Sequence, residues 1–548
     1  MNPHMMDIPL LISSLIEYAD RYHGDTEIVT RTVEGPIHRY NYSEAHGRSK
    51  KLANALSKLG VQKGDRIATL AWNTHRHLEI YYGVSGTGAI CHTVNPRLFE
   101  EQISYIINHA EDVCLFFDLT FLPIVEKLAS QFKTIKNYVL MTDQKNMPPN
   151  SISNIVCYEE LIKNESATFT WPVFSETTDS SLCYTSGTTG NPKGVMYQHR
   201  TTILHSYAAV MPDALNLSAR DIILPVVPMF HANAWGLPYA AALTGSKLVL
   251  PGAGMDGASL YELFENESVT LSAGVPTIWM GLVNYLKAEN LKFSTLERTV
   301  IGGSAVPPAM TRTFEEEYKV EVIHAWGMTE MSPLGTVSTL KRKHLPLSKK
   351  EQLNFKDKQG RAIYGVEMKI VDDNGEELPW DGKAFGELLV RGPWILRSYF
   401  KNNDEESLRE DANKLAWFPT GDVATIDPDG FMQITDRSKD VIKTGGEWIS
   451  SIDLENIAVS HPEISEAAVI AVSHPKWDER PLLVAVKKQD STVNSEELLG
   501  FFKGKTAKWW IPDDVVFVDG LPHTATGKLQ KTKLREEYAD YNLPTIKK

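Results

Sequence analysis

The densest group of potentially reactive residues is the segment Tyr184-Thr185-Ser186-Gly187-Thr188-Thr189-Gly190-Asn191-Pro192-Lys193-Gly194. Glycines let backbone N–H groups approach a polyphosphate, hydroxyl groups donate to its oxygens, and a lysine adds a positive charge. A Ser/Thr/Gly surface loop has a similar composition. A Walker A loop would place glycine at position 192 and Ser or Thr at 194, where this chain has Pro192 and Gly194. We therefore interpret the segment as a phosphate-binding loop of another kind.

Composition excludes several classes of function. The chain has 548 residues, with 56 Lys and Arg against 69 Asp and Glu, and a formal charge of −13. An acidic chain without a long basic tract is a poor candidate for nonspecific binding to nucleic acid or to an anionic membrane. The uncharged stretch 222–246 contains Pro225, Pro228 and Pro238, which favour a buried strand, a loop and a helix start over a membrane span. Four scattered cysteines fit a reducing cytoplasm.

Strand and helix patterns alternate along most of the chain and must position these residues. Residues 44–59 indicate an amphipathic helix that ends before Gly60, and 65–72 indicate a buried strand. The pattern repeats with a helix over 77–85 and a strand over 89–94. Such repetition favours an α/β fold with parallel sheets covered by helices. From about residue 365 the alternation of strands and helices gives way to short strands joined by turns such as Asp373-Asn374-Gly375.

The phosphate-binding segment resembles the signature loop of the acyl-adenylate-forming superfamily, which includes acyl-CoA synthetases, luciferases and peptide-synthetase adenylation domains. Further motifs match in family order between about residues 30 and 535: Trp326-Gly327-Met328-Thr329-Glu330, Thr420-Gly421-Asp422, Asp436-Arg437-Ser438-Lys439-Asp440, Gly445-Gly446-Glu447-Trp448-Ile449-Ser450 and Thr526-Gly527-Lys528. The resemblance implies a large N-terminal domain, 1–435, of packed α/β sheets with a small β-barrel-like part. A small, mobile α+β domain, 436–548, would follow.

The reaction that the resemblance implies is the ATP-dependent ligation of a carboxylic acid to a thiol. The carboxylate attacks the α-phosphorus of ATP, which gives an acyl-AMP and releases pyrophosphate. The thiol of coenzyme A then displaces AMP and forms a thioester. The implied partners are therefore a small-molecule carboxylic acid, ATP, Mg²⁺ and coenzyme A, and a homodimer is a family-level expectation. The protein must align two anions and offset their repulsion.

The resemblance also implies a nucleotide site and a metal site. Thr185 and Glu330 would contact Mg²⁺, although a lone acid such as Glu330 is more often simply solvated. Asp422 would accept hydrogen bonds from the ribose with support from Arg437, although Asp is also common in turns. The ATP and AMP contacts would come from Thr185, Ser186, Gly187, Thr188, Thr189, Lys193, Gly303, Ser304, Ala305, Ala325, Trp326, Gly327, Met328, Thr329, Asp422, Arg437 and Lys439.

Lys528 is the residue to which the resemblance assigns adenylation, because its cation can offset charge that builds at the α-phosphate. It lies far along the chain from Lys193, and the family solves this by rotating the small domain about a hinge, here Asp436. The other orientation would serve thioester formation. Its coenzyme A face would consist of Lys443, Gly445, Gly446, Glu447 and Trp448.

The acyl pocket is implied by Pro228-Met229-Phe230-His231-Ala232-Asn233-Ala234-Trp235-Gly236. Within it His231 would be an aromatic gate and second catalytic residue beside the reacting carboxylate, although a packed core histidine is the alternative. Trp235 would shorten the channel, and Gly303 and Trp394 would also contact the acid; the alternative for Trp394 is an anchor between domains. No charged residue stands in this segment to pair with an amino group, which disfavours amino-acid substrates.

This segment is most similar to the medium-chain fatty-acyl branch of the family. The acid that the resemblance implies first is 3-methylmercaptopropionate, from dimethylsulfoniopropionate breakdown, whose thioether Trp394 could cover. A general short- or medium-chain fatty acid is the alternative, since one methylene changes discrimination by only ~1–3 kcal/mol. A non-catalytic AMP-binding scaffold would be expected to lose some of the residues Lys193, Glu330, Asp422 and Lys528, and all four are present. A luciferase-like or carrier-loading enzyme is the third alternative. The sequence shows no carrier segment after residue 540, which disfavours a fused assembly line but leaves a free-standing carrier open.

Overall fold

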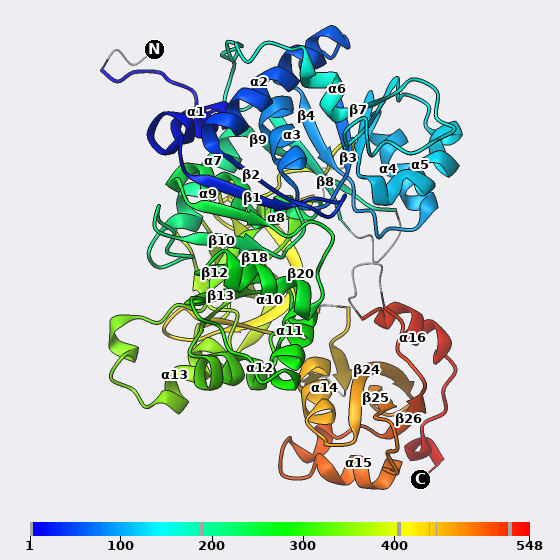
Figure 1. The fold of residues 1–548 in the computed structure, drawn as a ribbon. Helices are drawn as coiled ribbons and strands as arrows, with labels where there is room; N and C mark the ends of the chain where they lie inside the picture. Colours follow the sequence, from blue (N-terminus) through cyan, green and yellow to red (C-terminus); the bar gives the residue numbers. More distant parts are fainter. Residues whose placement is uncertain are drawn as a thin grey trace. The chain divides into compact units, whose positions relative to one another are not determined.

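The computed structural model describes residues 4–185, 191–402, 407–437, 439–444, 447–523 and 529–547. The described residues divide into two compact units (Figure 1). Unit 1 contains those within 1–185, 191–366 and 392–407, and unit 2 contains those within 367–391 and 408–548. Residues 367–391 and 408–435, which we expected in the large domain, thus group with the C-terminal residues. The predicted boundary at residue 436 stays a prediction.

One sheet of unit 1 has the strand order β16-β15-β14-β13-β12-β10-β11-β1-β2. Neighbouring strands from β14 to β1 are parallel, and β2, β15 and β16 are antiparallel additions at the two edges. Parallel strands end at the same edge of a sheet, so the segments that follow β10, β12, β13 and β14 lie along one edge. The strands are β1 (Glu27–Arg31), β2 (Ile37–Asn41), β10 (Ile222–Pro225), β11 (Lys247–Leu250), β12 (Leu271–Gly274), β13 (Arg298–Ile301), β14 (Glu321–Gly327), β15 (Leu334–Val337) and β16 (Arg361–Ala362).

The second sheet of unit 1 has the order β7-β6-β5-β3-β4-β8-β9. All neighbours are parallel except β9, which runs antiparallel to β8. The strands predicted over 65–72 and 89–94 are β3 and β4 here. Buried apolar runs such as 114–117 explain why both faces of the sheet are covered by helices. The strands are β3 (Arg66–Leu70), β4 (Ile90–Thr93), β5 (Cys114–Phe117), β6 (Asn137–Leu140), β7 (Ile155–Cys157), β8 (Asp179–Tyr184) and β9 (Gly194–Gln198).

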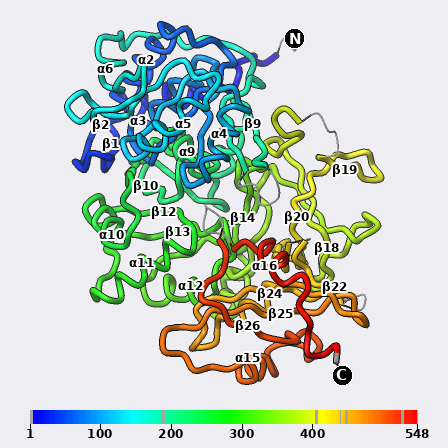
Figure 2. The backbone as a smooth tube through the Cα atoms, turned by 90° about the vertical axis from the view of Figure 1, so that its right-hand side faces the viewer, coloured from blue at the N-terminus to red at the C-terminus, as the bar shows by residue number. Residues whose placement is uncertain are grey.

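Local sequence sets where helices of unit 1 begin, as α2 shows. The helix predicted over 44–59 starts earlier, at Tyr42, because Asn41 and Glu44 form a capping box. Helices α10 and α11 pack through Leu263 and Trp279 beside β12 and β13 (Figures 1 and 2). The helices are α1 (Ile12–His23), α2 (Tyr42–Lys58), α3 (His75–Gly86), α4 (Glu100–Ala110), α5 (Leu122–Leu128), α6 (Tyr158–Lys163), α7 (His199–Val210), α8 (Ala232–Trp235), α9 (Leu237–Thr244), α10 (Gly257–Asn266), α11 (Pro276–Ala288), α12 (Pro308–Arg312) and α13 (Lys349–Lys356).

Unit 2 contains two further sheets. In the first, β17, β18, β20 and β19 follow one another antiparallel and β21 pairs with β20; this is the part that we expected to resemble a barrel. The second has the order β23-β22-β25-β24, with β26 parallel to β25. The strands are β17 (Glu367–Val371), β18 (Phe385–Arg391), β19 (Arg409–Glu410), β20 (Ala416–Ile426), β21 (Met432–Arg437), β22 (Ile442–Thr444), β23 (Glu447–Ile449), β24 (Ile464–His474), β25 (Asp478–Lys487) and β26 (Asp514–Val518).

The second sheet of unit 2 separates two small cores because side chains alternate along β24. Val469 packs with the helices α14 (Ser451–Val459) and α15 (Ser495–Phe501) on one face. Ile470 packs with Leu534 of α16 (Lys531–Glu537) on the other face. None of the helices in the described parts of the chain is long and apolar enough to span a membrane.

Candidate active site

The phosphate-binding segment connects the antiparallel strands β8 and β9. Tyr184 pairs with Gly194 at the last step of the ladder. Beyond it the Thr185 N–H donates to the Lys193 carbonyl at 2.9 Å, and the Lys193 N–H donates to the Thr185 hydroxyl oxygen at 3.2 Å. Two predicted phosphate and metal contacts, Thr185 and Lys193, therefore face each other at the neck of the loop. Ser186, Gly187, Thr188 and Thr189 lie outside the described residues.

Tyr399 connects Lys193 with the predicted metal ligand Glu330. The Lys193 ammonium lies 4.8 Å from the centre of the Tyr399 ring, which is a cation–π contact. The hydroxyl of the same ring donates to Oε1 of Glu330 at 2.8 Å. Burial and the neighbouring Glu330 carboxylate raise the pKa of Tyr399, so the hydroxyl keeps its proton. One ring thus touches both a cation suited to phosphate and a carboxylate suited to a metal.

Glu330 is held by the backbone on both sides of its short helical turn. Its side chain is buried, and its carbonyl accepts the Leu396 N–H at 2.8 Å. The preceding residue, Thr329, accepts the Tyr197 hydroxyl on its carbonyl at 2.6 Å. Tyr197 comes from β9, and the Gly194 carbonyl accepts the Phe400 N–H at 2.8 Å. The loop strand, the turn of Glu330 and segment 396–400 are therefore tied together within unit 1.

A magnesium ion fits this set of groups. Glu330 offers a hard carboxylate oxygen whose orientation is fixed by the Tyr399 hydroxyl, and the Thr185 hydroxyl offers another oxygen donor. Magnesium usually takes one or two carboxylates and completes its shell with phosphate oxygens and water. Such an ion needs no dedicated cage of protein ligands, so one carboxylate beside a phosphate loop is sufficient.

Most of the residues predicted to contact ATP and AMP outside the phosphate loop lie where β13 and β14 end. Gly303, at a φ of +81°, and the residues Ser304 and Ala305 are exposed directly after β13. Trp326 is the penultimate residue of β14, and a Cβ on Gly335 would stand 2.8 Å from its ring. The predicted set Ala325, Trp326, Gly327, Met328 and Thr329 continues from β14 into the turn of Glu330. These residues lie along the same sheet edge as Glu330, which shares the Tyr399 ring with Lys193 of the phosphate loop.

The predicted acyl segment contains a left-handed turn, which the sequence did not lead us to expect. Four consecutive residues without a glycine, Ala232 to Trp235, have φ between +43° and +56°, and Gly236 follows at +79°. Each such residue costs about 1–2 kcal/mol relative to right-handed backbone. His231 precedes the turn with extended backbone and is half-buried. The turn puts Trp235 beside Gly303, a predicted contact of the nucleotide and the acid, because a Cβ on Gly303 would stand 3.7 Å from its indole.

Trp394 is buried under the same edge. Its indole N–H donates to the Leu334 carbonyl at 3.3 Å, and its ring lies edge-on to His205 with centroids 6.0 Å apart. His205 accepts the Leu334 N–H on Nε2 at 3.1 Å, and burial lowers the pKa of this histidine to about 4. A Cβ on Gly236 would stand 2.9 Å from the His205 ring. His205 thus packs between the acyl turn and Trp394. The role of Trp394 in acid binding stays a prediction.

Unit 2 brings together the two residues predicted to hold the ribose. Asp422 in β20 pairs with Arg437 in β21, and Nε of Arg437 lies 2.9 Å from Oδ1 of the nearly fully buried Asp422. The predicted hinge, Asp436, is also buried and accepts the Ser451 N–H at 2.6 Å. Burial raises the pKa of Asp436, although nearby Lys531 opposes the effect. Both acids are therefore fixed by neighbouring backbone or side chains.

The remaining residues predicted for unit 2 are described only in part. Burial, aided by Arg535 and Arg437, lowers the pKa of Lys439. The Lys443 N–H in β22 donates to Glu479 at 2.8 Å. Glu447 and Trp448 begin β23, which pairs with β22, and nothing is described of their side chains. Gly445, Gly446 and the predicted catalytic Lys528 lie outside the described residues.

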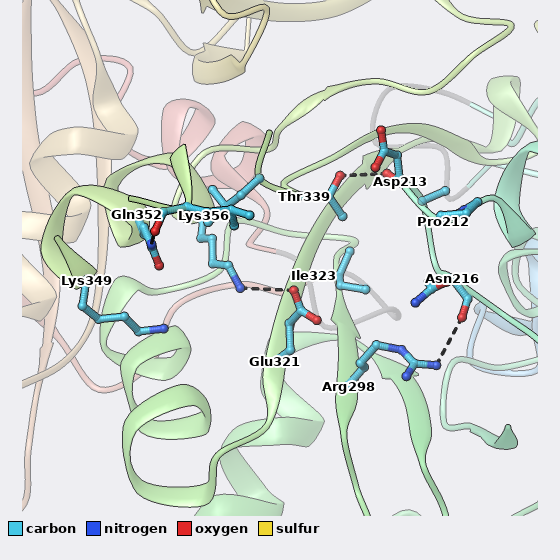
Figure 3. A pocket seen from close by; sticks show the side chains of 13 residues that line it. Pro212, Asp213, Asn216, Arg298, Glu321, Ile323, Thr339, Lys349, Gln352 and Lys356 are labelled. Atoms are coloured by element: carbon cyan, nitrogen blue, oxygen red, sulfur yellow. Dashed lines mark hydrogen bonds and ion pairs between the residues drawn. The ribbon is translucent and has the colours of Figure 1, made fainter. Parts of the chain in front are cut away.

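A cavity of about 340 Å³ in unit 1 lies away from these groups (Figure 3). It is lined by Arg298 and Glu321, which begin β13 and β14, whereas the predicted site lies where those strands end. Its cations already have partners, since Lys356 pairs with Glu321 at 3.4 Å and Arg298 pairs with Asp221 at 2.5 Å. We therefore do not assign this cavity to the nucleotide or the acid.

Sequence reasoning missed several residues that position the site. It gave no role to Tyr399, Tyr197, Asn233 or His205. Tyr399 stands five residues after Trp394 in Leu396-Arg397-Ser398-Tyr399-Phe400, and nothing in that spacing marks it. Asn233 carried one usable signal, because Asn tolerates left-handed backbone better than other non-glycine residues.

Two family matches cover most of the chain. Residues 16–400 match the AMP-binding enzyme family, and residues 453–528 match the AMP-binding enzyme C-terminal domain. The chain therefore belongs to the AMP-binding enzyme family. The interval between the two matches contains the predicted hinge, Asp436.

Similar proteins narrow this membership to acyl-CoA ligases. The 3-methylmercaptopropionyl-CoA ligase of Ruegeria lacuscaerulensis is 56% identical over 98% of each chain. The corresponding ligase of Ruegeria pomeroyi is 53% identical, also over 98% of each chain. The medium-chain-fatty-acid–CoA ligase of Ectopseudomonas oleovorans is 52% identical over 98% of this chain and 97% of its own.

Solved structures confirm the α/β fold. The anthranilate CoA ligase AuaEII, in complex with anthranoyl-AMP, superposes with a TM-score of 0.83 over 97% of this chain and 98% of its own, at 24% identity. ATP-bound MatB from Rhodopseudomonas palustris gives a TM-score of 0.80 over 96% and 99%, also at 24% identity. The likeness covers nearly the whole length of each protein.

Proposed function

We propose that this protein is an AMP-forming acyl-CoA ligase, an acid–thiol ligase that passes through an acyl-AMP. The observation that carries the proposal is the contact of Lys193 and Glu330 with one ring, Tyr399, beside the neck of the phosphate loop. A polyphosphate and its metal need a cation and a carboxylate at that place. Membership in the AMP-binding family and full-length likeness to acyl-CoA ligases support the same reaction.

We propose 3-methylmercaptopropionate as the acid, with a general short- or medium-chain fatty acid as the second candidate. The first is favoured by the 56% identity with the Ruegeria lacuscaerulensis ligase, and the second by the 52% identity with the medium-chain ligase. Trp235 beside Gly303 limits the room for the acid at the edge of the sheet. A small thioether acid is apolar and soft, which suits an aromatic wall.

In this proposal the residues of unit 1 bind and orient ATP and the acid. Lys193 and the hydroxyl groups of the loop hold the β- and γ-phosphates, while Gly303 to Ala305 and Trp326 enclose adenine. Glu330 and Thr185 would hold Mg²⁺, which would neutralise phosphate charge when bound. His231 stands beside the carboxylate, and its imidazole positions that group against the α-phosphorus. Closing these groups around the reactants excludes water from the mixed anhydride.

The residues of unit 2 complete the two half-reactions. Asp422 accepts hydrogen bonds from the ribose hydroxyl groups, and Arg437 holds its carboxylate in place. Lys528 supplies a cation to the adenylation step, in which the acid oxygen bonds to the α-phosphorus and pyrophosphate leaves. Rotation about Asp436 then presents Lys443 and the 445–448 segment to coenzyme A. The thiol sulfur bonds to the acyl carbon, and AMP leaves.

We further propose that the enzyme works in the cytoplasm and forms a homodimer. Its four scattered cysteines support the first point. The dimer rests on the family resemblance alone. Sedimentation or light scattering of the purified chain measures its mass directly, and a monomer at micromolar concentration contradicts this part of the proposal.

Pyrophosphate release with purified enzyme, Mg²⁺-ATP and coenzyme A tests the function. The panel of acids contains 3-methylmercaptopropionate and straight-chain acids of increasing length. We expect acid-dependent pyrophosphate and the matching acyl-CoA, with the highest kcat/KM for the thioether acid. A higher kcat/KM for a straight-chain acid selects the second candidate. No acid-dependent pyrophosphate with any acid refutes the ligase assignment.

A further inference from the structure

The left-handed turn of α8 is anchored by one side chain, that of Asn233. Its amide nitrogen donates to the Ser181 hydroxyl at 3.0 Å. Its amide oxygen lies 3.4 Å from the Tyr81 hydroxyl and 3.5 Å from Sγ of Cys183. All four residues are at least nine-tenths buried. Both ends of the amide are therefore held by groups from β8 and α3.

The rest of the turn offers no comparable anchor. Its other left-handed residues are Ala232, Ala234 and Trp235, and the alanines have no polar side-chain atoms. Asn accepts left-handed backbone more readily than alanine or tryptophan, because its short polar side chain can hydrogen-bond locally. Gly236 closes the turn against the His205 ring. The conformation therefore depends on the Asn233 amide at one end and on Gly236 at the other.

The turn decides where two residues of the proposed acyl pocket stand. His231 directly precedes it, and Trp235 is its last residue, beside Gly302 and Gly303. If the turn relaxed to right-handed backbone, the chain direction would change between these two positions. Strain of this kind persists only where surrounding contacts enforce it, and it gathers at functional sites.

We propose that Asn233 is the positioning residue of the acyl pocket. Through its amide it holds the left-handed turn, and so it sets the place of His231 and Trp235 against the acid. This inference rests on the proposed ligase function and adds to it the residue that determines the shape of the acid site. Asn233 acts through this turn, and we expect ATP binding not to depend on it.

The test uses four variants of the full chain, assayed by pyrophosphate release with separate titrations of acid and ATP. Asn233→Ala removes the amide and the tolerance for left-handed backbone, and Asn233→Gly removes the amide alone. Ser181→Ala removes the partner of the amide. Asn290→Ala is the matched control, because Asn290 also has a left-handed φ, +54°, but is exposed at the end of α11. Thermal unfolding confirms that each variant is folded.

We expect both Asn233 variants to raise the KM for the acid about tenfold, with the KM for ATP within about twofold of the parent, because the turn loses its anchor and the buried Ser181 hydroxyl loses its partner. Ser181→Ala shifts the acid KM in the same direction and adds little in the Asn233→Ala background. Asn290→Ala lowers only the melting temperature.

Three results would overturn the inference: an Asn233→Gly variant equal to the parent, equal shifts of both KM values, or no shift in folded variants. If Asn233→Ala does not fold, the acid KM of Ser181→Ala still tests the inference. A parent without activity on any acid refutes the ligase function instead, and is recognised before the variants are compared.

Discussion

Among single residues, Tyr399 has the contacts with the clearest consequence for nucleotide binding. Its ring lies under the Lys193 ammonium, and its hydroxyl donates to Glu330. One side chain thus contacts both the cation and the carboxylate of the proposed nucleotide site. Tyr399 therefore acts through Lys193 and Glu330 as a positioning residue of the proposed nucleotide site.

Tyr399→Phe tests this role because it keeps the ring and removes only the hydroxyl. A hydrogen bond to a charged group contributes about 1.5–3 kcal/mol. We expect the KM for ATP at fixed Mg²⁺ to rise about tenfold while the KM for the acid stays near that of the parent. Tyr261→Phe is the control, since its hydroxyl donates to the Lys292 carbonyl at an exposed site. An unchanged KM for ATP contradicts the role.

The sequence could indicate the charged residues of the site but not the groups that position them. Lys193, Glu330, Asp422 and Arg437 stand in short motifs that the family resemblance marks. Tyr399 is 206 positions from Lys193 and 69 from Glu330, so only the folded chain brings them together. Local spacing carries no information about such contacts.

At the scale of elements, the junction before β17 requires a glycine for two separate reasons. Gly365 has a φ of +104°, and a Cβ there would stand 2.3 Å from the Trp394 ring. Gly35 has a similar φ, +110°, but nothing lies within 4 Å of its added Cβ. The pair separates the cost of backbone conformation from the cost of the clash with Trp394.

Gly365→Ala and Gly35→Ala, measured by urea unfolding, use this difference. We expect Gly35→Ala to lower the free energy of unfolding by about 1–2 kcal/mol through backbone strain alone. Gly365→Ala should cost about 2 kcal/mol more, because Trp394 must move within a packed core. Equal losses for the two variants would mean that the Trp394 contact is not tight.

His205 gives the packing under the acyl turn a dependence on pH. Burial lowers the pKa of His205 to about 4, against about 6.5 in the unfolded chain. Between these pH values the unfolded chain binds more protons at this histidine than the folded chain does. The free energy of unfolding contributed by neutral, buried His205 is therefore complete above pH 6.5 and falls as the pH is lowered toward 4.

A His205→Gln variant measures this contribution and retains an acceptor for the Leu334 N–H. Between pH 6.5 and pH 5 we expect the parent to lose about 2 kcal/mol more unfolding free energy than the variant, as 1.36 kcal/mol corresponds to one pH unit. His4→Gln, at an exposed position, should behave like the parent. A parallel pH dependence of parent and His205→Gln would contradict the assignment.

How well the elements could be predicted depends on where their stability originates. The strands β3 and β4 are short, almost fully buried segments, and the start of α2 is set by the nearby residues Asn41 and Glu44, so local sequence sufficed to place them within a few residues. The left-handed turn at Ala232–Trp235 is held by Ser181 and Tyr81, which are distant in sequence. No local pattern could reveal it.

At the scale of the whole molecule, the account requires that two parts of the chain serve one reaction. Unit 1 holds Thr185 and Lys193 at the neck of the predicted phosphate loop, Glu330 and the acyl turn, and unit 2 holds Asp422, Asp436 and Lys443. The sequence analysis predicted Asp422 in the large domain, 1–435, and the adenylating Lys528 in the small one, 436–548, whereas Asp422 groups with the C-terminal residues in unit 2. The boundary between the parts and the hinge at Asp436 stay predictions, because they concern a rotation between two states.

The most direct test of this account is to assay the two half-reactions of a Lys528→Ala variant separately. Acid-dependent exchange of pyrophosphate into ATP reports adenylation, and acyl-CoA formed from supplied acyl-AMP reports thioester formation. We predict that exchange falls at least a hundredfold, on the order expected when a catalytic charge is removed, while thioester formation from acyl-AMP stays within about threefold of the parent. Exchange at the parental rate would contradict the central claim that the small domain supplies the cation for adenylation.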